Sequence, residues 1–144
     1  MAQSKSSDAP VKNSLTARSL DIMINCPFSE AYNFAHRPEN FPKWAAGLSS
    51  SLHRDGETWR ASTPAGEATI RFSPHNDYGV LDHWVTLPGK PVVYIPLRMI
   101  ANGAATEVVF TLFRQPDMDD AAFERDAATV VKDLDALKAV LERR

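Results

Sequence analysis

The chain has 144 residues, of which 44% are hydrophobic, and this length and composition suit one domain with a single core. Its 16 basic and 18 acidic residues give a formal net charge of -2, so there is no basic field to attract nucleic acid or anionic lipid. No segment approaches the roughly 18 apolar residues of a membrane span, so we expect no membrane insertion. The single cysteine, Cys26, makes neither an internal disulfide nor a zinc site alone. We therefore expect a cytoplasmic protein with no bound metal or cofactor.

The first half of the chain begins with a polar segment and continues with a strand and two short helices. Residues 1–14 carry no periodicity, which predicts a disordered N-terminal tail before a domain over 15–144. Residues 15–25 alternate in polarity and predict a first strand. Residues 28–36 follow a proline and repeat apolar residues at helical spacing, whereas 38–47 begin with proline and end with glycine. Two short helices are therefore expected after the first strand.

The middle of the chain is divided by turn signals that recur about every 8 to 13 residues. The connections have the size of hairpin loops, so the strands between them should form an antiparallel sheet. Asn102-Gly103 predicts a type I′ turn, because both residues tolerate positive φ. The six strands expected here cover 49–54, 58–62, 67–73, 80–87, 92–101 and 105–115.

The last segment, 119–142, has the periodicity of a long amphipathic helix of about 35 Å. Only this helix is long enough to cover the apolar face of the sheet. The sequence therefore predicts an α+β fold: a seven-stranded curved antiparallel sheet around a long C-terminal helix, with two short helices after the first strand. The expected core-facing stripe consists of Phe123, Ala127, Val130, Val131, Leu134, Leu137 and Leu141.

The Asn102-Gly103 turn also predicts which residues of the last hairpin face the core. If these two residues are the centre of the turn, Arg98 lies opposite Glu107 and forms an outer-face ion pair with it. The inner face then carries Ile95, Leu97, Met99, Val108, Phe110 and Leu112.

The preceding hairpin places a carboxylate near the expected core. With Leu87 opposite Val92, His83 faces outward, whereas Asp82 and Trp84 point inward. A carboxylate among aromatic rings would have a raised pKa and could act as a general acid or base. His83 could assist Asp82 only in a different register, because adjacent strand residues face opposite ways.

Two stretches, INCPFSEAYNFAHRPENFPKW and DAATVVKDLDALKAVLE, carry a family resemblance. With a helix-opening Pro27, an aromatic Phe34 and the spacing from Pro38 to Trp44, the chain resembles the polyketide cyclase/dehydratase and lipid-transport branch of the START and Bet v 1-like superfamily (SRPBCC). The resemblance implies a helix-grip fold whose interior cavity holds hydrophobic molecules. Similar proteins include carriers, cyclases, dehydratases, receptors and chaperone activators, so the resemblance does not select one activity.

These observations favour binding of a small hydrophobic ligand, lipophilic, aromatic or polyketide-like, without catalysis. One alternative is a cyclase or dehydratase that uses Asp82, with or without His83, for proton transfer. A second is a non-catalytic protein-interaction module, and a homodimer stays open as an assembly. The residues expected to line the ligand cavity are Trp44, Trp59, Phe72, Trp84, Leu97, Met99, Phe110, Phe123 and Val130.

Overall fold

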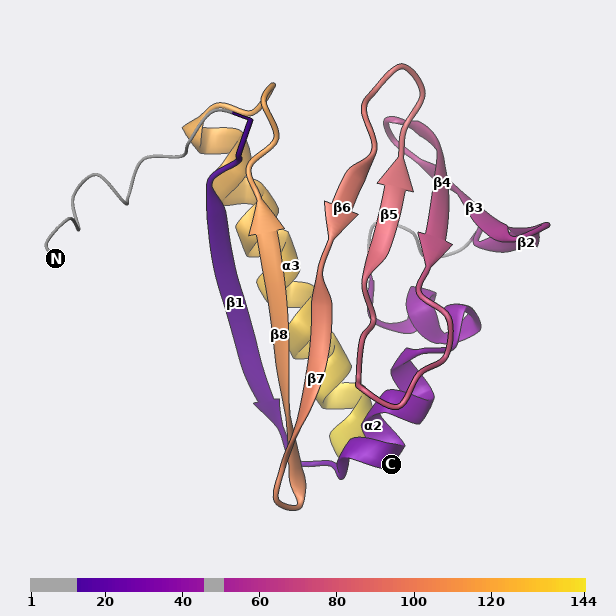
Figure 1. Ribbon diagram of the computed structural model, residues 1–144, viewed down its shortest axis with the longest axis vertical. Helices are drawn as coiled ribbons and strands as arrows, with labels where there is room; N and C mark the ends of the chain where they lie inside the picture. The colour runs from indigo at the N-terminus through magenta and orange to yellow at the C-terminus, as the bar shows by residue number, and fades with distance from the viewer. Residues whose placement is uncertain (1–12, 46–50) are drawn as a thin grey trace, which may run out of the picture.

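The computed structural model describes residues 13–45 and 51–144, which form eight strands, two α-helices and one 3₁₀ helix (Figure 1). The predicted tail over 1–14 lies outside the described residues except for its last two, as do 46–50. In chain order the elements are β1 (Ala17–Ile24), α2 (Phe28–Ala35), η1 (Pro38–Lys43), β2 (His53–Asp55), β3 (Thr58–Thr63), β4 (Gly66–Phe72), β5 (His83–Thr86), β6 (Val93–Ile95), β7 (Leu97–Asn102), β8 (Ala105–Phe113) and α3 (Asp120–Glu142).

The strands form an antiparallel sheet in two parts, one in the order β1-β8-β7 and one in the order β2-β3-β4-β5-β6. The expected strand over 92–101 is present but is interrupted by Pro96, whose missing N–H removes a ladder hydrogen bond. Its first half pairs with β5 and its second half with β8, so this strand joins the two parts. An isolated bridge between Val80 and Arg98 continues the β5 register along β7. The predicted α+β fold with a curved antiparallel sheet is confirmed.

The last hairpin turns one residue later than predicted. Asn102 pairs with Ala105, so the central residues are Gly103 and Ala104, and Gly103 has the positive φ of 59°. Arg98 consequently lies opposite Val109, and the predicted Arg98–Glu107 pair is wrong. Because the register moves by two residues, each side chain keeps its predicted face. Leu97, Met99, Val108 and Leu112 are buried as expected.

The hairpin between β5 and β6 has a larger consequence, because its register differs from the predicted one by a single residue. His83 pairs with Ile95, and Trp84 pairs with Tyr94. A one-residue shift exchanges the two faces of a strand. His83 therefore faces inward and is 4% exposed, while Asp82 and Trp84 lie on the outer face, which corrects the predicted orientation of all three.

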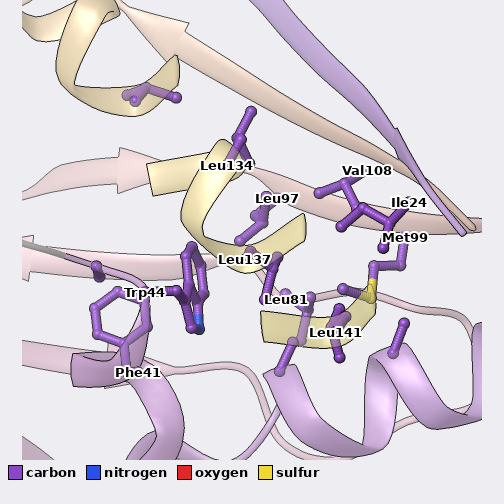
Figure 2. Close-up of a cluster of buried hydrophobic side chains, with 14 of the residues drawn as sticks. Ile24, Phe41, Trp44, Leu81, Leu97, Met99, Val108, Leu134, Leu137 and Leu141 are labelled. Atoms are coloured by element: carbon purple, nitrogen blue, oxygen red, sulfur yellow. The ribbon is translucent and has the colours of Figure 1, made fainter. Parts of the chain in front are cut away.

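Helix α3 runs across the concave side of the sheet and forms the main core with it (Figures 1 and 2). Asp119 caps its first turn by accepting a hydrogen bond from the Ala122 N–H at 2.8 Å. Its buried stripe matches the prediction except at Val131, which is 44% exposed. The core side chains labelled with it in Figure 2 are Ile24, Phe41, Trp44, Leu81, Leu97, Met99 and Val108.

Candidate functional site

A pocket of about 340 Å³ opens where the first half of α3 and the sheet diverge. Its wall is formed by α3, the C-terminal part of β8, strands β5 and β6, and the segment that ends η1. Most of the wall is apolar and aromatic, which is the usual character of a small-molecule site. Side chains of this kind include Phe41, Trp44, Val85, Ile95, Phe110 and Val130.

Residues of β6 and β8 line the pocket where these two strands separate. The hydrogen bond from the Thr111 N–H to the Pro96 carbonyl, at 3.0 Å, joins the chain between β6 and β7 to β8. Beyond Pro96 strand β6 pairs with β5 instead, and residues of both β6 and β8 line the pocket. Figure 1 shows β6 and β8 diverging from that point. The break at Pro96 therefore provides the space that the pocket occupies.

Three polar residues of α3, Asp126, Thr129 and Asp133, line the pocket and were missed by the sequence analysis. They lie beside the apolar stripe, and Asp126 and Asp133 each follow a stripe residue, Phe123 or Val130, by three positions. Because residues i and i+3 share a helix face, this spacing was an available signal. Within the described lining of the pocket there is no lysine or arginine, so its ionisable side chains give it acidic character.

His83 and Trp44, two buried residues with ring nitrogens, line the inner end of the pocket. His83 Nδ1 lies 3.0 Å from the Leu81 carbonyl oxygen; a carbonyl can only accept, so Nδ1 carries the proton. Burial lowers the pKa of His83, which keeps the ring neutral with Nε2 as an acceptor. The Trp44 indole is 5% exposed, and its Nε1–H has no acceptor in the described part of the chain.

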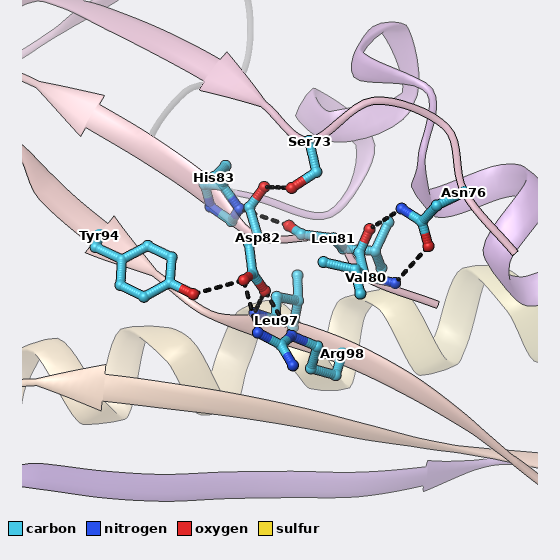
Figure 3. A network of polar contacts seen from close by, with 9 residues as sticks. All are labelled: Ser73, Asn76, Val80, Leu81, Asp82, His83, Tyr94, Leu97 and Arg98. Carbon is cyan, nitrogen blue, oxygen red and sulfur yellow. Dashed lines mark hydrogen bonds and ion pairs between the residues drawn. The ribbon is translucent and has the colours of Figure 1, made fainter. Parts of the chain in front are cut away.

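On the opposite face of the same hairpin, Asp82 is the centre of a polar network (Figure 3). Its carboxylate accepts hydrogen bonds from the Tyr94 hydroxyl at 2.6 Å and the Leu97 N–H at 2.9 Å. Arg98 adds two more, from Nε and an Nη, each at 2.8 Å. Asp82 thus lies opposite the prolyl interruption and binds residues on both sides of it.

The network also decides the charge state of Asp82. Burial would by itself raise the pKa of this carboxyl group, but the hydrogen bonds from Arg98, Tyr94 and Leu97 outweigh burial and hold the pKa below its usual value. Asp82 is therefore an ionised, fully engaged carboxylate. The sequence analysis predicted a raised pKa in an apolar cavity, and both the direction and the location are corrected.

Solved structures resemble this arrangement closely, although no protein-family model and no curated protein sequence matches the chain. The Aha1 dimer from Colwellia psychrerythraea is 16% identical with a TM-score of 0.69, over 89% of this chain and 97% of that one. A START superfamily protein from Mycobacterium smegmatis is 10% identical with a TM-score of 0.68, over 88% and 97%. DynU16, a protein of the dynemicin biosynthetic locus, is 15% identical with a TM-score of 0.67, over 88% of this chain and 47% of that one.

The chain has the START and Bet v 1-like helix-grip fold. Identities this low establish the fold, so function is argued from the site. Within residues 13–45 and 51–144, no helix has the length and hydropathy needed to cross a bilayer. The same ranges hold no group of three or more His, Cys, Asp or Glu side chains that could bind a metal ion.

The helix-grip geometry separates the predicted cavity residues into three groups. Trp44, Phe110 and Val130 line the pocket. Phe72, Leu97, Met99 and Phe123 lie in or against the main core outside the pocket wall. Trp59 packs against a small second cluster beside Ala61, Ala68 and Ile70, and Trp84 stacks on Tyr94 on the outer face with ring centroids 5.3 Å apart.

Asp126 on the pocket wall predicts a measurable pH effect on stability. Burial raises the pKa of its carboxyl group, and no described residue forms an ion pair with it. A carboxyl group whose pKa is raised on folding costs stability above its unfolded pKa of about 3.9, because the charged form is disfavoured in the native state. We expect Asp126→Asn to raise the melting temperature at pH 7 by about 1 to 3 °C, and the gain to vanish below about pH 4.

The matched control is Asp135→Asn, which removes an exposed carboxylate from the same helix. Thermal melts at pH 3.5, 5 and 7 followed by circular dichroism provide the comparison. Equal effects of the two substitutions at pH 7, or a gain from Asp126→Asn that persists at pH 3.5, would contradict the assignment of a desolvated carboxyl group to position 126.

Proposed function

We propose that this protein binds a small, uncharged, largely apolar molecule in the pocket between α3 and the sheet. The observation that carries the proposal is the pocket itself, whose volume of about 340 Å³ lies in the range of small-molecule sites. Burial of apolar ligand surface against the aromatic and aliphatic wall would supply most of the affinity. The wall carries Asp126, and its described residues include no lysine or arginine, which disfavours an anionic head group such as a fatty-acid carboxylate.

Catalysis by Asp82 receives less support from the geometry. A cyclase or dehydratase of the kind considered above would need a titratable group directed at the bound molecule. The four hydrogen bonds to Asp82 come from the outer face of the hairpin, and the inward-facing neighbour is His83. A binding protein needs no proton-transfer group, so we propose ligand binding without catalysis. The interaction-module alternative would predict no affinity for apolar molecules.

The proposal is tested with N-phenyl-1-naphthylamine, an uncharged fluorescent probe, added to the full-length protein. We expect saturable fluorescence enhancement with one site per chain. Val130→Trp places an indole at the pocket wall and should weaken the binding about tenfold or more, equivalent to at least about 1.4 kcal/mol. The matched control is Val131→Trp at the next position of α3, where the side chain is 44% exposed and does not line the pocket.

Circular dichroism verifies that both tryptophan variants fold. If Val130→Trp is unfolded, Val93→Trp on the opposite wall of the pocket makes the same test. Absence of saturable binding to the wild-type protein would overturn the proposal. Equal loss of affinity in the variants at positions 130 and 131 would also overturn it, because the probe would then bind elsewhere.

A homodimer stays a prediction. Light scattering coupled to size-exclusion chromatography measures it directly, and a mass of one chain at micromolar concentration would contradict it.

A further inference from the structure

Two ring nitrogens of buried residues that line the inner end of the pocket bear on the choice of ligand: Trp44 Nε1, which is buried without a hydrogen-bond partner in the described ranges, and His83 Nε2, whose ring bonds to Leu81 through Nδ1. One is the Trp44 Nε1–H, which can only donate, and the other is the unprotonated His83 Nε2, which accepts. The residues that carry them are 5% and 4% exposed. Buried polar groups without partners are uncommon in native proteins, so the Trp44 Nε1–H requires an explanation.

A second, much smaller cavity lies at this place. Its volume is about 10 Å³, which is about the space of one water-sized group. Phe41, Trp44 and His83 line both this small void and the ligand pocket, so the two spaces are adjacent at these three side chains. Ring contacts hold them in position: the Phe41 centroid lies 5.0 Å from that of Trp44 and 5.4 Å from that of His83.

We propose that the ligand carries a hydroxyl group, an alcohol or a phenol, which occupies this small void at the inner end of the pocket. Its oxygen accepts from Trp44 Nε1–H and its proton is donated to His83 Nε2, while the apolar body of the molecule fills the pocket. This inference rests on the proposed function and specifies the ligand class of the same site.

The hydroxyl group follows from the pairing of one donor with one acceptor. A carbonyl or ether oxygen would satisfy Trp44 but would face the His83 lone pair with nothing to donate. An ammonium group could donate to His83 but could not accept from Trp44. A pure hydrocarbon would leave both nitrogens without partners in a dry cavity. Of these groups, only the hydroxyl completes both hydrogen bonds at once.

The experiment compares 1-naphthol with 1-methoxynaphthalene by titration calorimetry, because the two probes share the ring system and differ in the ability to donate. For the wild-type protein we expect 1-naphthol to bind about tenfold more tightly. Trp44→Phe removes the donor and keeps an aromatic ring, and should reduce this preference about threefold or more. Trp84→Phe, on the outer face and outside the pocket wall, is the matched control and should preserve the preference.

A spectroscopic measurement supports the affinity data. The chain has 3 tryptophans, so the indole region of a ¹H–¹⁵N spectrum should show one signal for each, and Trp44→Phe assigns the relevant one. We expect 1-naphthol to move the Trp44 Nε1–H signal more than the ether does. His83→Gln, which alters the acceptor, should reduce the preference for 1-naphthol and provides a second variant if Trp44→Phe does not fold.

Each outcome decides between the two proposals. If neither probe binds, the proposed function fails together with this inference. If both probes bind equally and the Trp44 indole signal responds equally to them, the pocket binds ligands but the two nitrogens hold only a resident water, and the hydroxyl inference is overturned. If Trp84→Phe abolishes the preference for 1-naphthol as fully as Trp44→Phe does, the ligand hydroxyl group is not bound at Trp44, and the inference is again overturned.

Discussion

Replacing Asp82 by asparagine is expected to lower the free energy of unfolding by about 2 to 4 kcal/mol. The carboxylate accepts four hydrogen bonds, two of them from Arg98, and its side chain is 7% exposed. An asparagine presents one oxygen and one amide group, so at least one of the surrounding donors faces another donor. The lost hydrogen bonds lie where Pro96 interrupts the strand, so the β5–β6 hairpin should be destabilised as well.

Urea unfolding at pH 7 measures this loss, with Asp117→Asn as the matched control because Asp117 belongs to an exposed ion pair with Lys90. The control should leave the unfolding midpoint nearly unchanged. The pKa of Asp82 is lowered on folding, so its contribution is present above the unfolded pKa and is lost as the pH falls through the folded one. The gap between wild type and Asp82→Asn should therefore shrink on acidification. A gap below about 0.5 kcal/mol at pH 7 would contradict a stabilising network.

This expectation changes how activity measurements on Asp82 must be interpreted. A variant at this position would lose turnover by unfolding as readily as by losing a proton-transfer group. A loss of activity in Asp82→Asn supports catalysis only if the variant retains the stability of the wild-type protein under the assay conditions. The Tyr94→Phe variant is a useful companion, because it removes one of the four donors and leaves the carboxylate in place.

Element order and buried faces followed from the sequence because hydrophobic periodicity reports burial directly. The alternation of β1, the stripe of α3 and the inner face of β7 and β8 were predicted on this basis. Val131 is the exception on α3, since it lies next to Val130 in sequence and therefore about 100° away around the helix. Apolar character alone did not distinguish it from the true stripe.

Strand register was not predictable, because it depends on which residues a turn uses. The Leu87 carbonyl accepts from the Lys90 N–H at 3.1 Å, so the tight turn has Pro88 and Gly89 at its centre, and Gly89 has a φ of 71°. This is the pattern of a type II turn. The first pair beyond this loop is Val85 with Val93, a register one residue away from the predicted pairing of Leu87 with Val92. That one-residue difference exchanged the expected faces of Asp82 and His83, and with them the assignment of the acid/base candidate.

The pocket itself was predicted as a consequence of the fold, whereas most of its wall was not. A pocket forms where α3 and the sheet diverge, and the divergence depends on the break at Pro96, which looks in sequence like any edge proline. Trp59 and Trp84 were expected to line the cavity, but they lie at the small second cluster and on the outer face. Asp126 and Asp133 were overlooked because polar residues on an amphipathic helix ordinarily face solvent.

Gly79→Ala is expected to be the most destabilising single-methyl change considered, at about 3 kcal/mol or more. Gly79 has a φ of 73°, and a Cβ there would lie 2.1 Å from the Met99 carbonyl oxygen and 2.9 Å from Phe28 Cε1. The Gly79 carbonyl also accepts a hydrogen bond from the Met99 N–H at 2.8 Å, so the backbone cannot move away without losing it. Positive φ alone costs an alanine about 1 to 2 kcal/mol, and the contact with a backbone atom adds to that cost.

Gly89→Ala separates these two contributions, because Gly89 has nearly the same φ, 71°, but no heavy atom of the described chain lies within 4 Å of its would-be Cβ. Urea unfolding should therefore show a loss of about 1 to 2 kcal/mol for Gly89→Ala and at least twice that for Gly79→Ala. Equal losses would mean that the segment before Val80 does not pack against β7 as closely as the Val80–Arg98 bridge requires. That segment leads directly into Asp82 and His83, so a large loss of unfolding free energy in Gly79→Ala should be accompanied by weaker binding of the naphthylamine probe. Gly89→Ala should leave probe binding intact.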